Sequence, residues 1–354
     1  MYVPPFALRN GYAMTIYAGL RARQIWEDTV HDPEPSSEQI FEHIFSGEKD
    51  VPLFSQVALP LNPKATIIAT YGITGNLDDQ WQLQLLRRKA LARGYAVVLF
   101  DWRAHGKTAE LSPTLTSDGL YEGKDFVKIA AQSKPLGCPA PFWFTGFSLG
   151  GQLALWGIKT AQTLNQWIEN PERTLGISEA ELAGGAVICP SLDSTRSLRY
   201  LANHPLGQYL ERAITGELKK LAHRIATYHP GIFDIEALER VNSIWSFDHE
   251  LIIQSLGFSS VEEYYAACSP LPFLAHLEKP TYILYAADDP LFDPGIAPEL
   301  PALAAKNPNL QLTLTPHGGH VGYISNQSCQ RQMGDPDRWW AWNRILDWFE
   351  IGLV

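Results

Sequence analysis

The chain has 354 residues, 45% of them hydrophobic and 19% charged, which is enough apolar material for one large α/β domain or two small ones. A formal net charge of −10 without a basic cluster argues against nucleic acid and anionic membrane surfaces as partners. The four scattered cysteines form no C-x-x-C pair, so they argue against a disulfide framework or a zinc site and favour a reducing compartment.

No membrane or export signal is recognisable in the sequence. Residues 1–5 hold no basic segment followed by an apolar region, which a signal peptide would need. No uninterrupted apolar run approaches the roughly 18 residues of a membrane-spanning helix. We therefore expect a protein without an integral membrane segment, located in the cytoplasm.

From about residue 64 onward, short apolar runs alternate with longer helical patterns. The runs cover residues 65–71, 95–100, 141–147, 185–189, 280–285 and 311–315, and the helical patterns cover residues 79–93, 120–131, 150–166, 298–305 and 338–351. Runs that are apolar almost throughout are typical of strands covered on both faces. The alternation therefore predicts a mostly parallel, doubly wound α/β sheet.

One long stretch interrupts this alternation. Residues 192–277 contain no clear strand but several helical patterns, such as residues 208–226 and 235–241. An insertion at this place would lie over the carboxyl ends of the strands, where ligands bind in open α/β folds. We predict a core of residues 1–191 and 278–354, with a helical cap of residues 192–277 inserted before the last two strands.

A G-x-S-x-G sequence, Gly146-Phe147-Ser148-Leu149-Gly150, joins the third predicted strand to the helix that follows it. This arrangement lifts a serine onto a sharp, exposed turn, and the glycines let the backbone turn without a clash. A serine held in this way attacks a carbonyl if a neighbouring base takes its proton. Ser148 is therefore the candidate nucleophile.

A serine on such a turn is followed along the chain by an acid and then by a histidine, each after a late strand. Asp289 lies just past the predicted strand at residues 280–285, and His320 follows the strand at 311–315 after two glycines that let the imidazole reach back. Both order and placement fit a triad of Ser148, Asp289 and His320.

The acid and the histidine of this triad each have alternatives. Asp288 precedes Asp289 and could be the acid, although holding the turn is the role we favour for it. Asp193 lies where some hydrolases place their acid, and His317 competes with His320.

The oxyanion of an acyl-transfer reaction needs two backbone N–H donors. Leu149 supplies one at the start of a helix, where N–H groups are unpaired. Ile73, in the glycine-bearing loop after the first of these strands, is our choice for the second. The loop after the next strand holds Asp101, Arg103 and His105, for which we favour a structural hydrogen-bonding role over contact with substrate.

Together these motifs resemble the α/β-hydrolase superfamily, in particular its group of lipases and esterases found in bacteria, plants and animals. The resemblance runs over nearly the whole chain, through residues 4–11, 146–151, 247–248, 257–258, 264–265, 268–274, 279–281, 287–290 and 317–322. Two positions depart from the pattern: Tyr71 stands where a histidine usually precedes the oxyanion glycine, and Arg103-Ala104-His105-Gly106 replaces an Arg-Gly-x-x-Gly-type loop.

The resemblance implies a serine carboxylester hydrolase that acts on a lipid-like or other hydrophobic acyl ester and needs no metal or organic cofactor. Other acyl chemistry on the same triad (thioesterase, amidase or acyltransferase) and a weakly catalytic ligand-binding protein remain alternatives. Several apolar side chains of residues 192–277 could line an acyl pocket or form the cap's own core, namely Leu206, Tyr209, Leu210, Trp245, Phe247, Tyr264, Tyr265 and Phe273.

Overall fold

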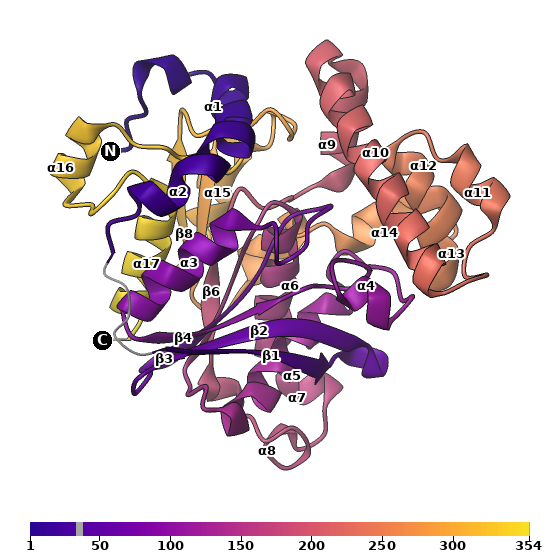
Figure 1. Cartoon of the computed structure of the whole chain (residues 1–354), viewed down its shortest axis with the longest axis horizontal. Coiled ribbons are helices and arrows are strands. Elements are labelled where there is room, and N and C mark those ends of the chain that lie inside the picture. Colours follow the sequence, from indigo (N-terminus) through magenta and orange to yellow (C-terminus); the bar gives the residue numbers. More distant parts are fainter. Residues whose placement is uncertain (33–37, 354) are drawn as a thin grey trace.

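Eight strands form one sheet in the computed structural model, which describes residues 1–32 and 38–353 (Figure 1). They are β1 (Glu38–Ser46), β2 (Pro52–Pro60), β3 (Ala65–Thr70), β4 (Tyr95–Phe100), β5 (Phe142–Phe147), β6 (Leu182–Ile188), β7 (Thr281–Ala286) and β8 (Leu310–Thr315). Their order across the sheet is β1-β2-β4-β3-β5-β6-β7-β8. In this order the neighbouring strands from β4 to β8 pair in parallel, whereas the β1–β2 and β2–β4 pairs are antiparallel.

The predicted mostly parallel α/β sheet is thereby confirmed, since β3 to β8 coincide with the six predicted apolar runs. The antiparallel strands β1 and β2 precede residue 64 and lay outside the predicted pattern. Strand β1 is at the edge of the sheet and keeps most of its residues exposed or half-buried, so it lacks the continuous apolar run that marks the central strands.

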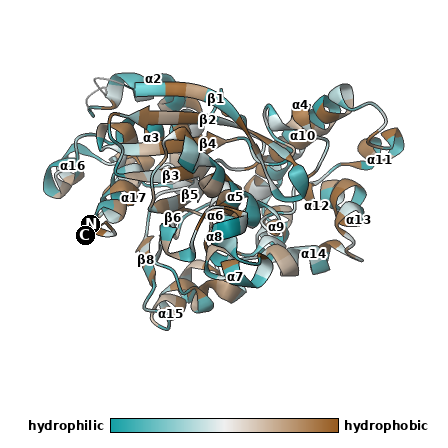
Figure 2. Ribbon diagram, turned by 90° about the horizontal axis from the view of Figure 1, so that it is seen from below, coloured by the Kyte–Doolittle hydropathy of each residue, from teal (hydrophilic) through white to brown (hydrophobic). Residues whose placement is uncertain are grey.

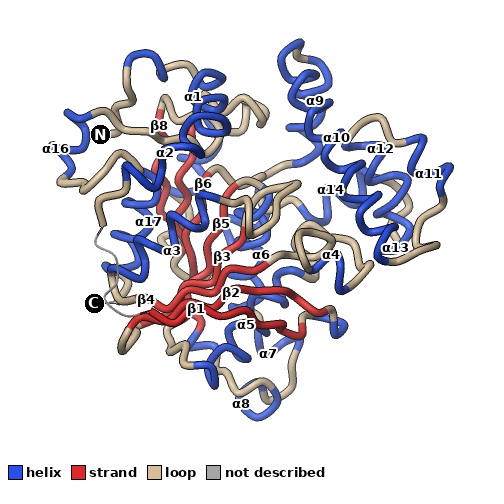
Figure 3. Tube along the Cα trace, in the orientation of Figure 1, coloured by secondary structure: helices blue, strands red, loops and turns tan. Residues whose placement is uncertain are grey.

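Helices cover both faces of the sheet (Figure 3). Consecutive residues of a strand point to opposite faces, so β5 shows what lies on each. Trp143 packs on Phe349 of one helix, and Phe144 packs on Phe126 of another. These helices are α17 (Trp340–Ile351) and α5 (Glu122–Ser133). This two-sided cover is the physical reason why the central strands are apolar throughout.

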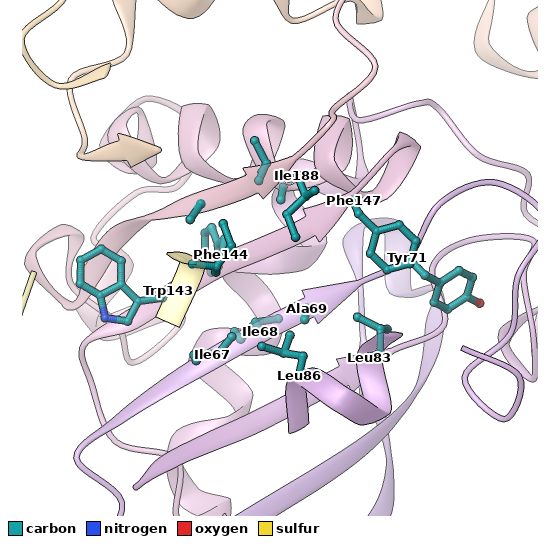
Figure 4. Close-up of a cluster of buried hydrophobic side chains, with 14 of the residues drawn as sticks. Ile67, Ile68, Ala69, Tyr71, Leu83, Leu86, Trp143, Phe144, Phe147 and Ile188 are labelled. Carbon is teal, nitrogen blue, oxygen red and sulfur yellow. The ribbon is translucent and has the colours of Figure 1, made fainter. Parts of the chain in front are cut away.

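The other helices of this part of the chain connect the strands or lie at the ends of the chain. They are α1 (Gly11–Tyr17), α2 (Arg23–Thr29), α3 (Trp81–Ala92), α4 (Thr108–Leu111), α6 (Leu149–Gln162), α7 (Leu164–Trp167), α8 (Pro171–Thr174), α15 (Leu300–Ala304) and α16 (Gln327–Met333). Figure 4 shows Leu86 of α3 near Ile68 of β3, and Leu83 of the same helix further along, on the side of Ala69. Figure 2 shows hydrophobic residues along the central strands and hydrophilic ones on outlying helices such as α16.

Between β6 and β7 the chain forms a separate group of helices (Figures 1 and 3). They are α9 (Ser194–Asn203), α10 (Pro205–Tyr228), α11 (Ile235–Arg240), α12 (Ile244–Phe247), α13 (Ile253–Leu256) and α14 (Val261–Cys268). The Leu271 N–H donates to the Leu192 carbonyl over 3.0 Å, so the segment leaves and re-enters the sheet region at one place. We refer to residues 192–277 as the cap segment.

No helix within the described residues is long and apolar enough to cross a bilayer. All four cysteines are buried and free. Burial makes these thiols small apolar core groups rather than reactive sites.

A buried cation ties the two ends of the chain to α3. Lys89 is fully buried, and its Nζ lies 2.6 Å from Oδ2 of the equally buried Asp337. The same ammonium group also pairs with Asp32, just before the undescribed residues 33–37. A lysine is found fully buried almost only when it is paired in this way.

We expect Lys89→Met to lower the free energy of unfolding by about 3–5 kcal/mol, because it leaves two carboxylates near the protein interior without their cation. Urea unfolding would measure the loss. Lys220→Met is the matched control, since its ion pair with Glu217 is exposed and worth about 1 kcal/mol at most. Equal losses in the two variants would contradict the prediction.

Candidate active site

Ser148 lies on a tight turn between β5 and α6. Its backbone angles, φ 57° and ψ −129°, are in a region that non-glycine residues rarely adopt. A Cβ on Gly146 would lie 2.3 Å from the carbonyl oxygen of Gly150, and one on Gly150 would lie 2.3 Å from that of Tyr71. The turn therefore requires glycine at both positions and presents the serine between them.

His320 and Asp289 come together at the ends of β8 and β7. The His320 Nδ1 lies 2.8 Å from Asp289 Oδ2, while Asp289 Oδ1 accepts the Leu291 N–H over 2.9 Å. An ionised carboxylate accepts only, so Nδ1 carries the proton and Nε2 is left as a base. Two further contacts hold the histidine. Its backbone N–H donates to Thr15 Oγ1 over 2.8 Å, and Phe292 packs edge-on against its ring.

The structure places the alternative residues in other roles. Asp288 accepts the Gly319 N–H over 2.9 Å, and its other oxygen is 3.5 Å from His317 Nδ1, so it holds the loop before His320. Asp193 accepts the Arg196 N–H and begins α9 as its N-cap. Only Asp289 of these three acids contacts the His320 imidazole.

Phe292 is the described link between His320 and the surroundings of Ser148. Among the described residues, no hydrogen bond joins Ser148 Oγ to the imidazole, although Phe292, which packs on His320, lines a cavity together with Ser148. Hydrogen bonds of this kind are often long in structures without a ligand and tighten when substrate binds.

This cavity has a volume of about 890 Å³ including its open mouth, and most of its lining is apolar. One side belongs to the sheet region and includes Ser148, Leu149 and Ile73. The other side belongs to the cap segment and consists mainly of Leu198, Leu201, Ile214, Leu218, Leu221, Ile244, Phe247, Ile252 and Tyr265. Such a concave apolar site next to a reactive group is typical of a ligand pocket.

Of the eight apolar residues proposed from the sequence as pocket or cap core, Phe247 and Tyr265 line the cavity. Tyr264 is buried in the cap segment, whereas Leu206, Tyr209 and Trp245 are exposed. The sequence reasoning missed Ile214, Leu218 and Leu221 of α10. Their spacing of four and three residues places them on one helix face, and this signal could have identified them.

Two backbone N–H groups next to Ser148 have no partner. No group among the described residues accepts the N–H of Ile73 or of Leu149, and both residues line the cavity with the serine. Leu149 is the first residue of α6, so its N–H also lies at the positive end of the helix dipole. Two unpaired donors beside one hydroxyl can receive a developing negative charge.

The loop after β4 is bound to its surroundings by the three residues for which we predicted a structural role. Arg103 is buried and makes a two-bond ion pair with Asp125, over 2.7 and 2.8 Å. Asp101 and His105 accept hydrogen bonds from the loop that contains Ile73. His105 also lines the cavity.

Two buried carboxyl groups also line the cavity, Asp248 from the cap segment and Asp118 from the sheet region. Asp248 Oδ2 accepts from the Tyr265 hydroxyl over 2.5 Å, and Asp118 Oδ1 accepts from Thr116 Oγ1 over 3.2 Å. Within the described part of the chain neither carboxyl forms an ion pair. Burial and the nearby Glu122 charge raise the pKa of Asp118 to about 7, and burial with the Asp118 charge raises the pKa of Asp248 well above its ordinary range.

We expect the protein to lose stability as the pH rises through about 7. The folded state keeps protons on these carboxyls that the unfolded chain releases near pH 4, so their contribution is fully present below that pH and is lost at higher pH. Thermal unfolding between pH 5 and 8.5 should show a falling midpoint, with a flatter slope in Asp248→Asn. Equal slopes in the two proteins would contradict this origin.

Sequence comparison identifies relatives of the chain. The profile of the alpha/beta hydrolase family matches residues 72–329. A protein of Synechocystis sp. named "Putative esterase" is 52% identical over 350 residues, covering 99% of this chain and 94% of the relative. An Escherichia coli protein with the same description is 32% identical, covering 82% of this chain and 78% of the relative. Phospholipase ABHD3 of Mus musculus is 28% identical, over 74% of this chain and 59% of the relative.

Solved structures of other proteins share this fold. An esterase of Pyrococcus furiosus superposes with a TM-score of 0.52 at 16% identity, over 92% of this chain and 100% of the other. A bacterial heroin esterase superposes with a TM-score of 0.51 at 18% identity, over 99% and 95%. At these identities the likeness concerns the fold alone. With its fold, its family profile and its relatives in agreement, the chain belongs to the alpha/beta hydrolase family.

Proposed function

We propose that this protein is a serine carboxylester hydrolase with Ser148 as nucleophile, His320 as base and Asp289 as the acid that orients the base. The observation that carries the proposal is the position of Ser148 beside two unpaired N–H groups at an apolar cavity. The hydrogen bond between His320 and Asp289 supports it, as do the relatives named esterases.

The reaction would proceed in two steps. His320 Nε2 takes the Ser148 proton as Oγ attacks the ester carbonyl, and Asp289 stabilises the imidazolium that forms. The N–H groups of Leu149 and Ile73 receive the oxyanion, each such donor being worth about 3 kcal/mol of barrier. The ester C–O bond then breaks, the alcohol leaves with the proton from His320, and water repeats the attack on the acyl-enzyme.

The cavity supports an ester with a hydrophobic acyl group as substrate. Its cap-segment side carries mainly aliphatic and aromatic side chains, which would remove an acyl chain from water. The phospholipase named among the relatives is consistent with a lipid-like substrate. Residues 192–277 would then act as the cap that encloses the acyl chain.

A fluorophosphonate probe tests this function directly, because it reacts preferentially with a serine that a base has activated. We expect mass spectrometry to find the adduct on Ser148 in the wild-type protein. Rates on matched oxygen esters, thioesters and amides would then separate ester hydrolysis from other acyl chemistry. A folded protein that binds hydrophobic esters but is never labelled would overturn the proposal in favour of a binding protein.

A further inference from the structure

The loop that contains Ile73 passes Ser148 at backbone contact distance. We call residues 71–77, which follow β3, the oxyanion loop. A Cβ at Gly72 would lie 2.9 Å from the Ser148 Cβ and 3.2 Å from its Oγ. Because the approach is this close, a small displacement of the loop would move the Ile73 N–H away from the place where an oxyanion forms on Ser148.

The conformation of this loop is not one that its own residues favour. Thr74 has φ 61°, in the left-handed region that a β-branched residue rarely adopts. Such a conformation persists only when the surrounding structure holds it. The loop therefore depends on contacts from outside its own sequence.

Side chains of the neighbouring loop, after β4, supply these contacts. Asp101 Oδ1 accepts from the Tyr71 hydroxyl over 2.5 Å and from the Leu77 N–H over 2.9 Å, so it holds both ends of the oxyanion loop. The middle of the loop is held by His105, whose Nε2 lies 3.1 Å from the Thr74 nitrogen and accepts its N–H.

The surroundings of His105 determine which of its ring nitrogens is free to accept. Nδ1 lies 3.0 Å from the carbonyl oxygen of Arg103, which can only accept, so Nδ1 carries the proton and Nε2 does not. The ring is buried and stacked on Trp102, with 3.6 Å between the ring centroids. Burial lowers the pKa of His105 to about 4, so the ring stays neutral and keeps accepting from Thr74 around neutral pH.

We propose that His105 is a positioning residue, which holds Thr74 and thereby keeps the adjacent Ile73 N–H aimed at the oxyanion of the Ser148 reaction. This inference rests on the proposed function. His105 does not serve as a second base, because both of its ring nitrogens are engaged with backbone groups. Through Ile73, His105 stabilises the transition state more than the bound ester, because the ground-state ester needs the oxyanion donors less than the tetrahedral intermediate does.

A pair of conservative substitutions tests this role. In His105→Gln the side-chain oxygen can reach the place of Nε2 and accept from Thr74, whereas the shorter side chain of His105→Asn can replace only the contact with Arg103. With a soluble ester, we expect kcat to fall about 10- to 100-fold in His105→Asn with KM nearly unchanged, and most of the loss to be restored in His105→Gln. Rates are divided by the fraction of active sites titrated with the fluorophosphonate probe, so that partial unfolding does not count as lost catalysis.

Several results would overturn the inference. A wild-type kcat in His105→Asn, or a rise of KM alone, would show that the histidine does not act on the transition state. If His105→Asn does not fold, His105→Leu decides, because it fills the same buried site without an acceptor for the Thr74 N–H. An unchanged kcat in that variant would mean that the loop needs no such support. Absence of labelling in the wild-type protein would instead contradict the proposed function itself.

Discussion

Replacement of Ser148 by alanine is expected to lower kcat for a hydrophobic ester by several orders of magnitude. The variant lacks the atom that attacks the carbonyl, while the two N–H donors and the cavity remain. Steady-state kinetics at equal protein concentration would measure the loss. Circular dichroism and urea unfolding should show an intact fold, because alanine removes only a hydroxyl group that forms no hydrogen bond within the described residues.

A second serine provides the control for this measurement. Ser255 lies on α13, outside the cavity, and its hydroxyl donates to the Ile252 carbonyl. Ser255→Ala should keep the wild-type rate. Esterase activity of Ser148→Ala comparable to that of the wild-type protein would mean that another residue is the nucleophile, or that a contaminating enzyme accounts for the rate.

Asparagine at position 289 is expected to reduce kcat about 10³- to 10⁴-fold. The change keeps the shape of the side chain but removes the negative charge that the His320 Nδ1–H contacts over 2.8 Å. The imidazole then loses its preferred tautomer and the stabilisation of its charged form. The measurement is kcat for the same ester in both proteins, with thermal unfolding to confirm the fold.

The neighbouring acid provides an isosteric control. Asp288→Asn retains an oxygen that can accept the Gly319 N–H, so the loop before His320 stays in place and kcat should fall less than about tenfold. The two variants together decide between the acids that the sequence left open. If Asp288→Asn loses activity and Asp289→Asn does not, the assignment of the acid is wrong.

Much of the fold could be predicted because the central strands are covered on both faces. This burial requires apolar side chains at nearly every position, so β3 to β7 are visible as continuous runs, whereas β8, at an edge of the sheet, alternates apolar and polar residues. The edge strand β1 has no such requirement, since most of its residues remain exposed or half-buried. It therefore has no distinct pattern, and the sequence analysis did not include it.

Part of the candidate site could also be predicted from the sequence. The turn at Ser148 depends in part on local chemistry, since Gly146 is required by the Gly150 carbonyl within the turn, whereas Gly150 is required by the carbonyl of the distant Tyr71. The choice of Asp289 and His320 came from their places after two strands, and their hydrogen bond agrees with that choice. These residues could be found because parallel strands bring their carboxyl ends to one edge of the sheet.

By itself, the sequence determined the strands β3 to β8, the turn at Ser148 and the order of the three candidate catalytic residues, because each follows from side-chain patterns within a few residues. Only the tertiary structure decided that Thr15 holds His320, that His105 holds the oxyanion loop, and that Asp118 meets the cap segment at the cavity. These contacts join residues that are distant along the chain. Their geometry depends on how whole elements pack together, and no local pattern in the sequence records that packing.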